Sequence, residues 1–546
     1  MKEVRSKPRW RWLSAALLIL ALAALSSLMA SASGAAGSAS RSVKSGPIAP
    51  SSILTVAPAT KVTFAQQASR HIKTPARPAG VAINRPTVPL AQLKAMKAAA
   101  AAKAGSVSKP SPAVPNSSNV VVGQANLSSE CAAGDGCWFP SDIHGSVGLT
   151  QEVTVTNSHI NVYSKSPAAP VLLFETTLNS WFGYGAQALF DPQVQYDARW
   201  HRWVVTAEGF EEGAGGPQYL FVFISNTDSA LSGGTIYQFD PPAGFQDYQH
   251  FSLTQDGIIF TYSNFNPGFV DARMFAVAKA IMYNAAGFSV PVFTGFTGTL
   301  TSPNVIDQNP RAYALEFTPG VGVRAVMYRN AQTGVYGNVD LITPIAGEQV
   351  TPPPDAPQPA VPACSPAPES NCNLDTLDGR FVDEPTQSGD SLWAVHTVAL
   401  GSFAAPYWYQ FDIEGAGAFT IKQGGFKFVS GSSHDFNASI VATPLGRAYL
   451  QWAYTDPALA CATGCPSMAF AGRLNADPLN VMTPVTILHN SGIKLMGNLQ
   501  SGRQRWGDYS SIRFDPSSAT DAYLFQQRVV STSLWGTRAA TVRVIP

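Results

Sequence analysis

The sequence predicts an all-β protein built from many short strands, and three observations support this. The chain of 546 residues contains 45 Gly and 41 Pro, which suits strands joined by turns rather than a helical bundle. Runs of β-branched and aromatic residues such as RWVVTAE and QYLFVFISN recur after residue 119, broken by Gly, Pro, Asn and Asp. With 45% hydrophobic and 13% charged residues, the chain is able to bury a large core.

Residues 1–32 are typical of a secretory signal peptide. Five basic residues up to Arg11 precede an apolar run from Leu13 to Met29, and Ala30-Ser31-Ala32 offers a small-residue cleavage site. The alternative is an uncleaved membrane anchor, because about 17 apolar residues are at the lower limit for crossing a bilayer. We expect a secreted or cell-surface protein with no membrane span after signal cleavage.

Residues 33–118 are rich in Ala, Ser, Pro and Lys and almost free of aromatic residues. Such a composition buries too little surface to offset the entropy of ordering, so we expect a disordered linker or propeptide here. Within it, residues 91–104 have strong helix propensity. The lysines indicate a solvated tether, or alternatively contacts with anionic cell-wall polymers or lipid headgroups.

The charge is distributed unevenly along the chain. Residues 1–118 hold sixteen Lys or Arg and one acid, Glu3, so residues 119–546 hold 20 basic and 34 acidic residues. A nucleic-acid-binding body needs Lys and Arg to neutralise phosphates, so this acidic body argues against nucleic acid as a partner.

The six cysteines form three close pairs: Cys131 with Cys137, Cys364 with Cys372, and Cys461 with Cys465. Sequence alone allows fifteen connectivities, and in an exported chain local disulfides are the simplest of them. The rival interpretation is a metal site at the third pair, which lacks the His pair or second Cys pair that such a site needs.

A hairpin unit recurs along residues 119–546. An Asp followed by Pro, Tyr or Phe opens a strand-like run at Asp191, Asp247, Asp435 and Asp508, and each run is followed by a turn and a second strand. The four second strands, together with two further strands of the same kind, have their centres near Val204, Ile259, Ala314, Trp393, Leu450 and Leu524.

This period predicts one β-propeller of four-stranded blades. With a first group at Leu149 to Thr177 we count seven blades, and six is the alternative. Residues 351–373, with eight prolines, form a Pro-rich loop or hinge between two blades. The alternative fold is two β-sandwich domains separated by that hinge.

The segments FDPQVQYDARWHRWVVTA, FQDYQHFSLTQDGIIFTY and RWGDYSSIRFDPSSATDAYLFQQRVV resemble secreted bacterial β-propeller proteins of the hypothetical or sialidase-like type. The resemblance covers nearly all of residues 119–546 and implies the propeller fold. It implies little about activity, because one propeller scaffold hosts enzymes, lectins and docking platforms. Sialidases proper carry Asp-box repeats and an arginine triad; no Asp box is present, although Arg311, Arg505 and Arg513 are available for a triad.

The repeated aspartates are the candidate catalytic groups. Inner strands of a propeller begin near one mouth of the channel, so Asp191, Asp247, Asp435 and Asp508 are expected to converge there. Two carboxylates about 5–10 Å apart are what glycoside hydrolysis needs. A structural role in capping turns is the first alternative, and a Ca²⁺ ion held by several carboxylates is the second.

Two further features carry candidate residues. His396, within LWAVHTV, either faces the channel as an acid or base or is a satisfied core residue. The run Arg505-Trp506-Gly507-Asp508-Tyr509 either binds a sugar by stacking and hydrogen bonds, with Arg505, Trp506, Tyr509 and Asp435 as ligand-binding residues, or forms the turn of the closing blade.

Together these patterns favour a secreted propeller acting as a binding module, with an extracellular glycan or cell-surface polymer as partner. The alternative is a glycoside hydrolase or lyase that uses Asp191, Asp247 and Asp508. No cofactor other than the Ca²⁺ ion named above is expected. An open pocket holding two close acids would favour the enzyme. A channel closed by aromatic side chains would favour the binding module.

Overall fold

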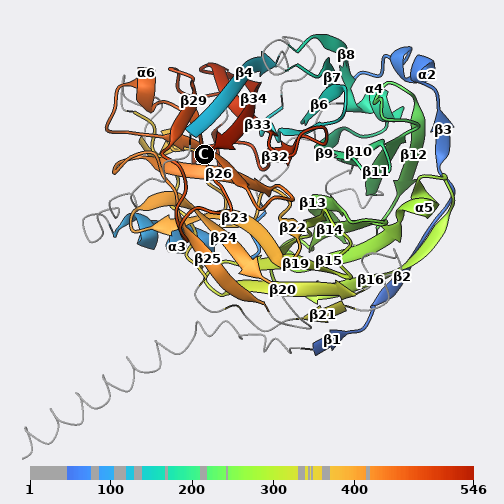
Figure 1. Ribbon diagram of the computed structural model, residues 1–546, viewed down its shortest axis with the longest axis horizontal. Coiled ribbons are helices and arrows are strands. Elements are labelled where there is room, and N and C mark those ends of the chain that lie inside the picture. Colours follow the sequence, from blue (N-terminus) through green and yellow to red (C-terminus); the bar gives the residue numbers. More distant parts are fainter. Residues whose placement is uncertain are drawn as a thin grey trace, which may run out of the picture. The chain divides into compact units, whose positions relative to one another are not determined.

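The computed structural model describes residues 46–75, 85–103, 119–127, 138–166, 170–209, 218–241, 244–329, 339–341, 345, 348–359, 369–413, 419–497 and 499–546. Seven sheets of four or five strands lie around a common axis, so the predicted seven-bladed β-propeller is confirmed (Figure 1). The signal peptide, residues 1–32, lies outside the described residues and stays a prediction.

The first three blades each take four strands from one continuous stretch of chain. Blade 1 contains β5 (His144–Val147), β6 (Gln151–Thr156), β7 (His159–Ser164) and β8 (Leu172–Thr177). Blade 2 contains β9 (Leu189–Asp197), β10 (Arg202–Gly209), β11 (Tyr219–Ser225) and β12 (Gly234–Phe239). Blade 3 contains β13 (Phe245–Leu253), β14 (Gly257–Phe265), β15 (Phe269–Ala278) and β16 (Phe288–Phe296).

Blades 4 to 6 follow in chain order, except that blade 5 takes one short strand, β18, from the stretch between β17 and β19 of blade 4. Blade 4 contains β17 (Thr299–Thr301), β19 (Arg311–Thr318), β20 (Gly322–Arg329) and β21 (Val339–Leu341). Blade 5 contains β18 (Asn304–Val305), β22 (Thr386–Ser388), β23 (Ser391–Leu400), β24 (Phe403–Asp412) and β25 (Thr420–Phe426). Blade 6 contains β26 (His434–Ala442), β27 (Ala448–Thr455), β28 (Ser467–Arg473) and β29 (Thr486–Asn490).

The last blade joins the two ends of the ring. It contains β32 (Ser511–Phe514), β33 (Ala522–Ser531), β34 (Leu534–Ile545) and, as its outer strand, β4 (Asn119–Leu127) from before blade 1. Because β4 pairs with β34 in antiparallel register along its whole length, backbone hydrogen bonds close the ring.

The remaining elements are short. A small hairpin pairs β30 (Leu499–Gln500) with β31 (Arg503–Gln504). The helices are α2 (Phe64–Ala68), α3 (Leu90–Ala101), α4 (Leu178–Phe182), α5 (Lys279–Met282), α6 (Cys461–Gly464) and the 3₁₀ turn η1 (Glu369–Cys372). Among the described residues, none of these helices has the length and hydropathy needed to cross a membrane.

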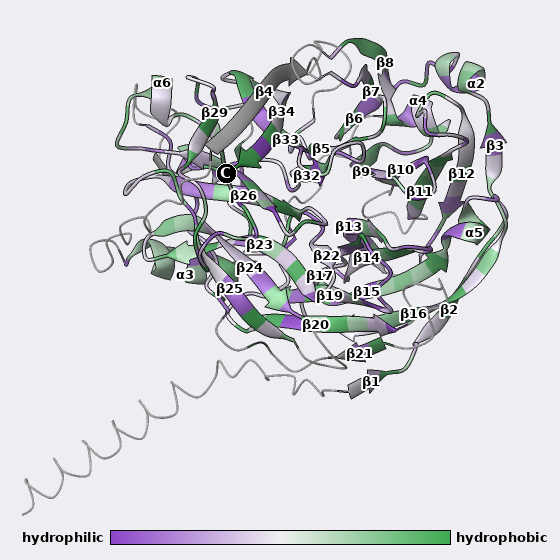
Figure 2. Ribbon diagram, in the orientation of Figure 1, coloured by the Kyte–Doolittle hydropathy of each residue, from purple (hydrophilic) through white to green (hydrophobic). Residues whose placement is uncertain are grey.

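Hydrophobic cores lie between neighbouring blades. In β10, Trp203 and Val205 pack toward blade 1, whereas Val204 between them packs toward blade 3. Since both faces of such a strand are buried, its sequence is apolar at successive positions. Figure 2 shows hydrophobic residues along the strands around the ring. Each fully buried Val, Leu, Ile or Phe contributes about 1.5–3 kcal/mol.

The N-terminal segment is folded onto the ring, which corrects the expectation of disorder for residues 46–75 and 85–103. We call these residues the strap. Its strands β1 (Gly46–Ile48), β2 (Ser52–Val56) and β3 (Thr60–Val62) extend blades 4, 3 and 2 as fifth strands (Figure 1). Leu54 and Val56 alternate with exposed residues and enter the core between blades 2 and 3.

The predicted helix within the strap is present as α3. Its Lys97 is buried and its Nζ lies 2.5 Å from Asp355 Oδ1, so this lysine serves internal packing rather than an anionic polymer. Removal of residues 33–118 by processing stays a prediction.

Part of the Pro-rich insertion is packed rather than hinge-like. Ala356 pairs with Leu374 and is fully buried in a cluster with Trp506. Cys461 and Cys465 form the predicted disulfide, which removes the metal alternative there. Cys372 is also disulfide-bonded, while Cys131, Cys137 and Cys364 lie outside the described residues.

Candidate functional site

The innermost strands of the blades place two sets of residues at opposite mouths of a central channel. We call the mouth where inner strands such as β9 and β13 begin the start mouth, and the other the end mouth. Asp191 and Asp247 lie near the beginnings of these strands, whereas Asp197 and Leu253 end them. Sequence-distant residues therefore meet at each mouth.

The start mouth brings together three of the four predicted aspartates. Asp247, Asp508 and two acids that the sequence reasoning missed, Asp142 and Glu208, all lie close enough to Asp191 to raise the pKa of its carboxyl. Burial is the larger cause of that rise, and it acts on Asp247 and Glu208 too. One carboxylate oxygen from each of Asp191, Glu208 and Asp247 lies within 4.8 Å of the others. We call these three residues the start-mouth cluster.

Asp508 is held by an ion pair. Both of its oxygens accept hydrogen bonds from Arg505 Nη2, at 2.5 and 2.6 Å, and Arg505 Nη1 donates to Asp375 at 2.6 Å. Burial lowers the pKa of Arg505, but Asp508 and Asp375 outweigh it and raise that pKa. Arg505 therefore neutralises buried acids and is not presented to a ligand.

Asp435 does not join the others, which corrects the expectation for this residue. Its carboxylate accepts hydrogen bonds from the Val429 backbone, the Ser433 hydroxyl and Trp452 Nε1, as a turn-capping residue does. β-Bulges in β9, β13 and β26 begin at Asp191, Tyr248 and Asn437, each with a positive φ. Asp435 lies two residues before the bulge of β26, whereas Asp191 lies at the bulge of β9, so the Asp435 side chain does not reach the start-mouth cluster.

Two buried aromatic rings pack beside the acids of the start mouth. Tyr509 donates from its hydroxyl to Asp191 Oδ2 at 2.9 Å and stacks on Tyr248, with ring centroids 5.2 Å apart. Trp506 is buried against Phe436, so it has no face for a sugar, and the expected stacking role is corrected. Both Tyr509 and Trp506 are 1% exposed.

His396 lies apart from these acids, in the packing between blades 4 and 5. Its Nδ1 lies 2.7 Å from the Gly379 carbonyl oxygen and its Nε2 2.9 Å from the Tyr409 hydroxyl. Burial lowers the pKa of His396 to about 4. The satisfied core residue is therefore the correct alternative, and the expected acid or base role is not supported.

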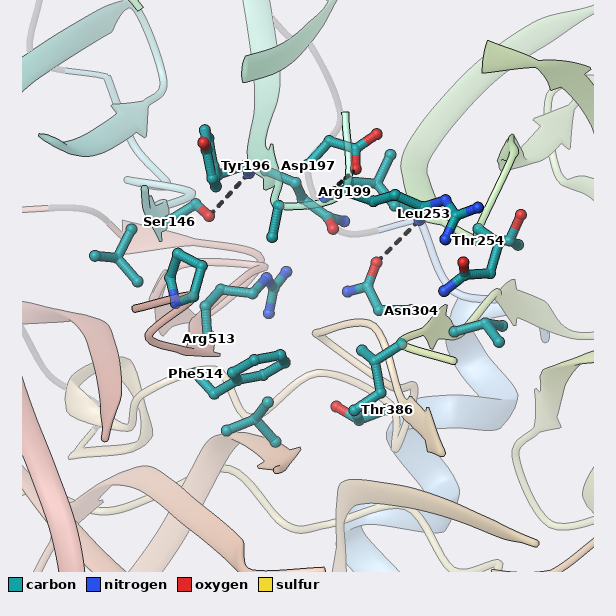
Figure 3. Close-up of a pocket in the computed structure, with 18 of the residues that line it drawn as sticks. Ser146, Tyr196, Asp197, Arg199, Leu253, Thr254, Asn304, Thr386, Arg513 and Phe514 are labelled. Atoms are coloured by element: carbon teal, nitrogen blue, oxygen red, sulfur yellow. Dashed lines mark hydrogen bonds between the residues drawn. The ribbon is translucent and has the colours of Figure 1, made fainter. Parts of the chain in front are cut away.

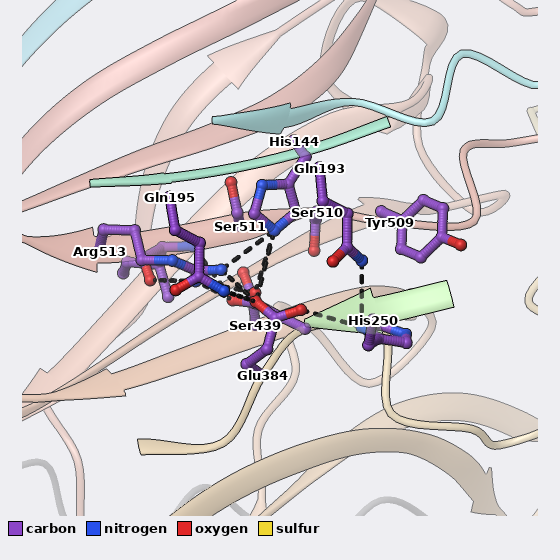
Figure 4. Close-up of polar contacts among 12 residues, drawn as sticks. His144, Gln193, Gln195, His250, Glu384, Ser439, Tyr509, Ser510, Ser511 and Arg513 are labelled. Carbon is purple, nitrogen blue, oxygen red and sulfur yellow. Dashed lines mark hydrogen bonds and ion pairs between the residues drawn. The ribbon is translucent and has the colours of Figure 1, made fainter. Parts of the chain in front are cut away.

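Deeper in the channel lies a second group of polar residues, of which the sequence analysis named only Arg513, as a possible member of an arginine triad (Figure 4). Glu384 accepts hydrogen bonds from Arg513 and Gln195 and lies 2.9 Å from His250 Nδ1. Arg513 Nη1 also donates to both oxygens of Asp383, at 2.8 and 3.0 Å. We call Glu384, Asp383, Arg513, His144 and His250 the channel network.

The channel network balances its own charge. Burial raises the pKa of Glu384, but Arg513, His144 and His250 together hold it well below its usual range. His144, Asp383 and Glu384 have the spacing of a metal site, yet the Arg513 guanidinium contacts all three. A cation is thus already built into this group.

A cavity of about 150 Å³ opens at the end mouth (Figure 3). Its lining combines apolar side chains, among them Leu253, Val305 and Phe514, with polar ones such as Thr254 and Arg513. Hydrogen bonds fix part of this wall, since Asn304 Oδ1 accepts from the Leu253 backbone at 3.0 Å. Such a wall suits a small ligand with one apolar and one polar side.

Comparison with known proteins adds no family. No protein-family model and no curated protein matches the chain. A subtype N10 neuraminidase-like protein of A/little yellow-shouldered bat/Guatemala/060/2010 shares 9% identity, over 58% of this chain and 93% of the other, with a TM-score of 0.33. An exo-β-1,3-galactanase from Phanerochaete chrysosporium shares 11% over 78% and 100%, with a TM-score of 0.30.

A third solved structure has different chemistry. The apocarotenoid oxygenase of Synechocystis shares 10% identity over 64% of this chain and 74% of the other, with a TM-score of 0.34. At these identities and TM-scores, function is argued from the site alone.

Proposed function

We propose that the protein is a binding module that holds a carbohydrate end group in the cavity at the end mouth. The observation that carries the proposal is the mixed lining of that cavity, which comes from several blades. A sugar ring offers an apolar C–H face and hydroxyl groups at its edge. Phe514 and Val305 suit the first, and Thr254 and Gln195 suit the second.

The size of the cavity limits the ligand. Its volume of about 150 Å³ is below the roughly 300–1,000 Å³ of most ligand pockets, so we infer that one terminal residue is enclosed rather than a length of polymer. The signal-like N-terminus supports an extracellular glycan or cell-surface polymer as the partner, because such a leader directs export.

The start mouth supports binding over hydrolysis. Its acids are close together, and the raised pKa of Asp191 suits a general acid. However, Asp191 and Glu208 are buried together with the stacked pair Tyr248 and Tyr509. A hydrolase acid must reach the glycosidic oxygen, which this burial opposes.

A glycan array run on the full chain tests the proposal. Ile306 lines the cavity and is partly buried, so Ile306→Trp is expected to fill it and weaken glycan binding at least about tenfold. Val321→Trp adds the same ring at a residue that is 68% exposed and is expected to leave binding unchanged. Equal binding by both variants would contradict the proposed site.

A polysaccharide-hydrolysis screen on the same protein separates the second candidate. We expect no turnover. Turnover that disappears in both Asp191→Asn and Asp508→Asn, with folding retained, would replace the binding module by a glycoside hydrolase or lyase.

A further inference from the structure

The start-mouth cluster carries more negative charge than its surroundings neutralise. The groups that shift the pKa of Asp191 are all acids, and the main charged neighbour of Glu208 is Asp247. Two cations lower the pKa of Asp247: Arg85 of the strap, with its Nε 3.6 Å from Asp247 Oδ2, and, to a lesser extent, Arg380, which is itself paired with Asp378. The ion pair with Arg85 therefore neutralises at most one of the three carboxylates of the start-mouth cluster.

Glu208 supplies the second, independent observation. Its side chain is fully buried, and among the described residues neither of its carboxylate oxygens has a hydrogen-bond partner. The backbone amide of Gln249 approaches and lowers its pKa in part, without reaching hydrogen-bond geometry. A buried carboxylate without partners destabilises the fold unless a proton or a cation joins it.

Position explains why Glu208 points at the other two acids. It pairs with Phe190 across β9 and β10, just beyond the bulge that begins at Asp191. The bulge turns the Asp191 side chain out of the regular alternation of the strand. Asp247 comes from the start of β13 in the next blade.

We propose that Asp191, Glu208 and Asp247 bind one divalent cation of the Ca²⁺ class. Every donor is a carboxylate oxygen, which selects hard cations over zinc or copper. Ca²⁺ takes oxygen ligands at about 2.4 Å, so two of them lie at most about 4.8 Å apart. The three donor oxygens meet this limit. This site is independent of the end-mouth cavity.

Alternative occupants fit less well. Protons on the carboxyls would neutralise the cluster but would leave the Glu208 oxygens without acceptors or donors among the described residues. The channel network has metal-like spacing as well, but the Arg513 guanidinium fills it.

The test begins with the wild-type full chain. After gel filtration in buffer with 1 mM CaCl₂, elemental analysis is expected to find about one Ca²⁺ per chain, and EGTA is expected to lower Tm by a few degrees. The proposal is overturned if the wild-type protein holds no Ca²⁺ and its Tm is unchanged by EGTA, whatever the variants do.

Variants then locate the ion. Glu208→Gln and Asp247→Asn are expected to bind Ca²⁺ at least about tenfold more weakly. Asp247 is partly exposed, so its variant remains informative if Glu208→Gln does not fold. The control is Glu152→Gln, which changes another buried acid whose pKa is raised, to about 7, by burial and which lies beside Lys165 instead. Ca²⁺ binding that survives in both cluster variants, or is lost in the control as well, overturns the assignment.

Discussion

Two groups of buried carboxylates lie along the same channel and differ in the cations that face them. In the channel network, Arg513 and two histidines hold the pKa of Glu384 well below its usual range, although burial alone raises it. In the start-mouth cluster, burial and neighbouring acids raise the pKa of Asp191 and Glu208. Carboxyl groups that are similarly buried therefore have pKa values shifted in opposite directions. The number of cations beside each group determines the direction of the shift.

The comparison also separates structural from ligand-binding charge. A network with its own arginine has its acidic charge balanced by the polypeptide itself, which suits a support for the cavity at the end mouth. A cluster without enough cations is incomplete in the polypeptide alone. That incompleteness is the reason to look for an ion at the start mouth.

The largest expected effect comes from removing the cation of the channel network. Arg513→Met leaves Glu384 and Asp383 buried without their main partner, so we expect the free energy of unfolding to fall by about 3–5 kcal/mol. Chemical denaturation measures this. The control is Arg543→Met, because Arg543 pairs with Asp521 but is 46% exposed, and its loss is expected to cost at most about 1 kcal/mol. A similar fall in the free energy of unfolding in both variants would show that the buried ion pairs of Arg513 contribute no more stability than the exposed pair of Arg543.

A second prediction uses the pH dependence of matched Glu→Gln variants in EGTA. The pKa of Glu208 is raised in the folded state, so folded protein still holds the Glu208 proton at pH values above about 4.3, where the unfolded chain has lost it. The free energy of unfolding of the wild type therefore falls as pH rises from about 4.3 toward the pKa of Glu208 in the folded state. Glu208→Gln removes this loss, so its stability relative to wild type is expected to increase from pH 4 to 8, by up to about 1.4 kcal/mol per pH unit within that window.

Glu384→Gln is expected to show the opposite sign. The lowered pKa of Glu384 stabilises the fold above about pH 4.3, and this contribution is lost as pH falls through the folded pKa. The variant should therefore be less stable than wild type by about 3 kcal/mol at pH 7, with a smaller deficit in acid. Unfolding curves at each pH provide the measurement. Parallel pH profiles for the two variants would show that cation number does not govern these acids.

Much of the fold was predictable because it is repeated. The six expected second strands coincide with β10, β14, β19, β23, β27 and β33. Their continuous apolar runs reflect burial on both faces, which any strand between two blades experiences. The strap was not predictable from composition, because three-residue and five-residue strands such as Ser52–Val56 are hidden in an Ala-, Ser- and Pro-rich average. Their partners are edges that exist only in the assembled ring.

The site was predictable only in part, for a similar reason. Asp191, Asp247 and Asp508 converge as expected because inner strands begin at one mouth. Asp435 does not converge with them. The bulge, and not the Asp-aromatic pair, is what recurs at the same place in each inner strand, and Asp435 lies two residues before its bulge. Glu208 was missed although it ends the apolar run RWVVTAE, where an acid is unusual enough to mark a buried charge.

The smallest expected effect concerns Arg85, a strap residue that contacts Asp247 of the start-mouth cluster. It lies 3.6 Å from Asp247 Oδ2 and 3.8 Å above the Phe245 ring, and its side chain is 11% exposed. Arg85→Gln is expected to cost about 1 kcal/mol, since a cation–π contact and one long ion pair are lost. Arg199→Gln is the control, because its Nε lies at the same 3.6 Å from Asp256 Oδ1 but its side chain is 46% exposed, and we expect it to be nearly neutral. If Arg85→Gln instead destabilised the protein as much as Arg513→Met in the same denaturation assay, the strap would already supply the charge that the start-mouth cluster lacks, and the two clusters would be equivalent.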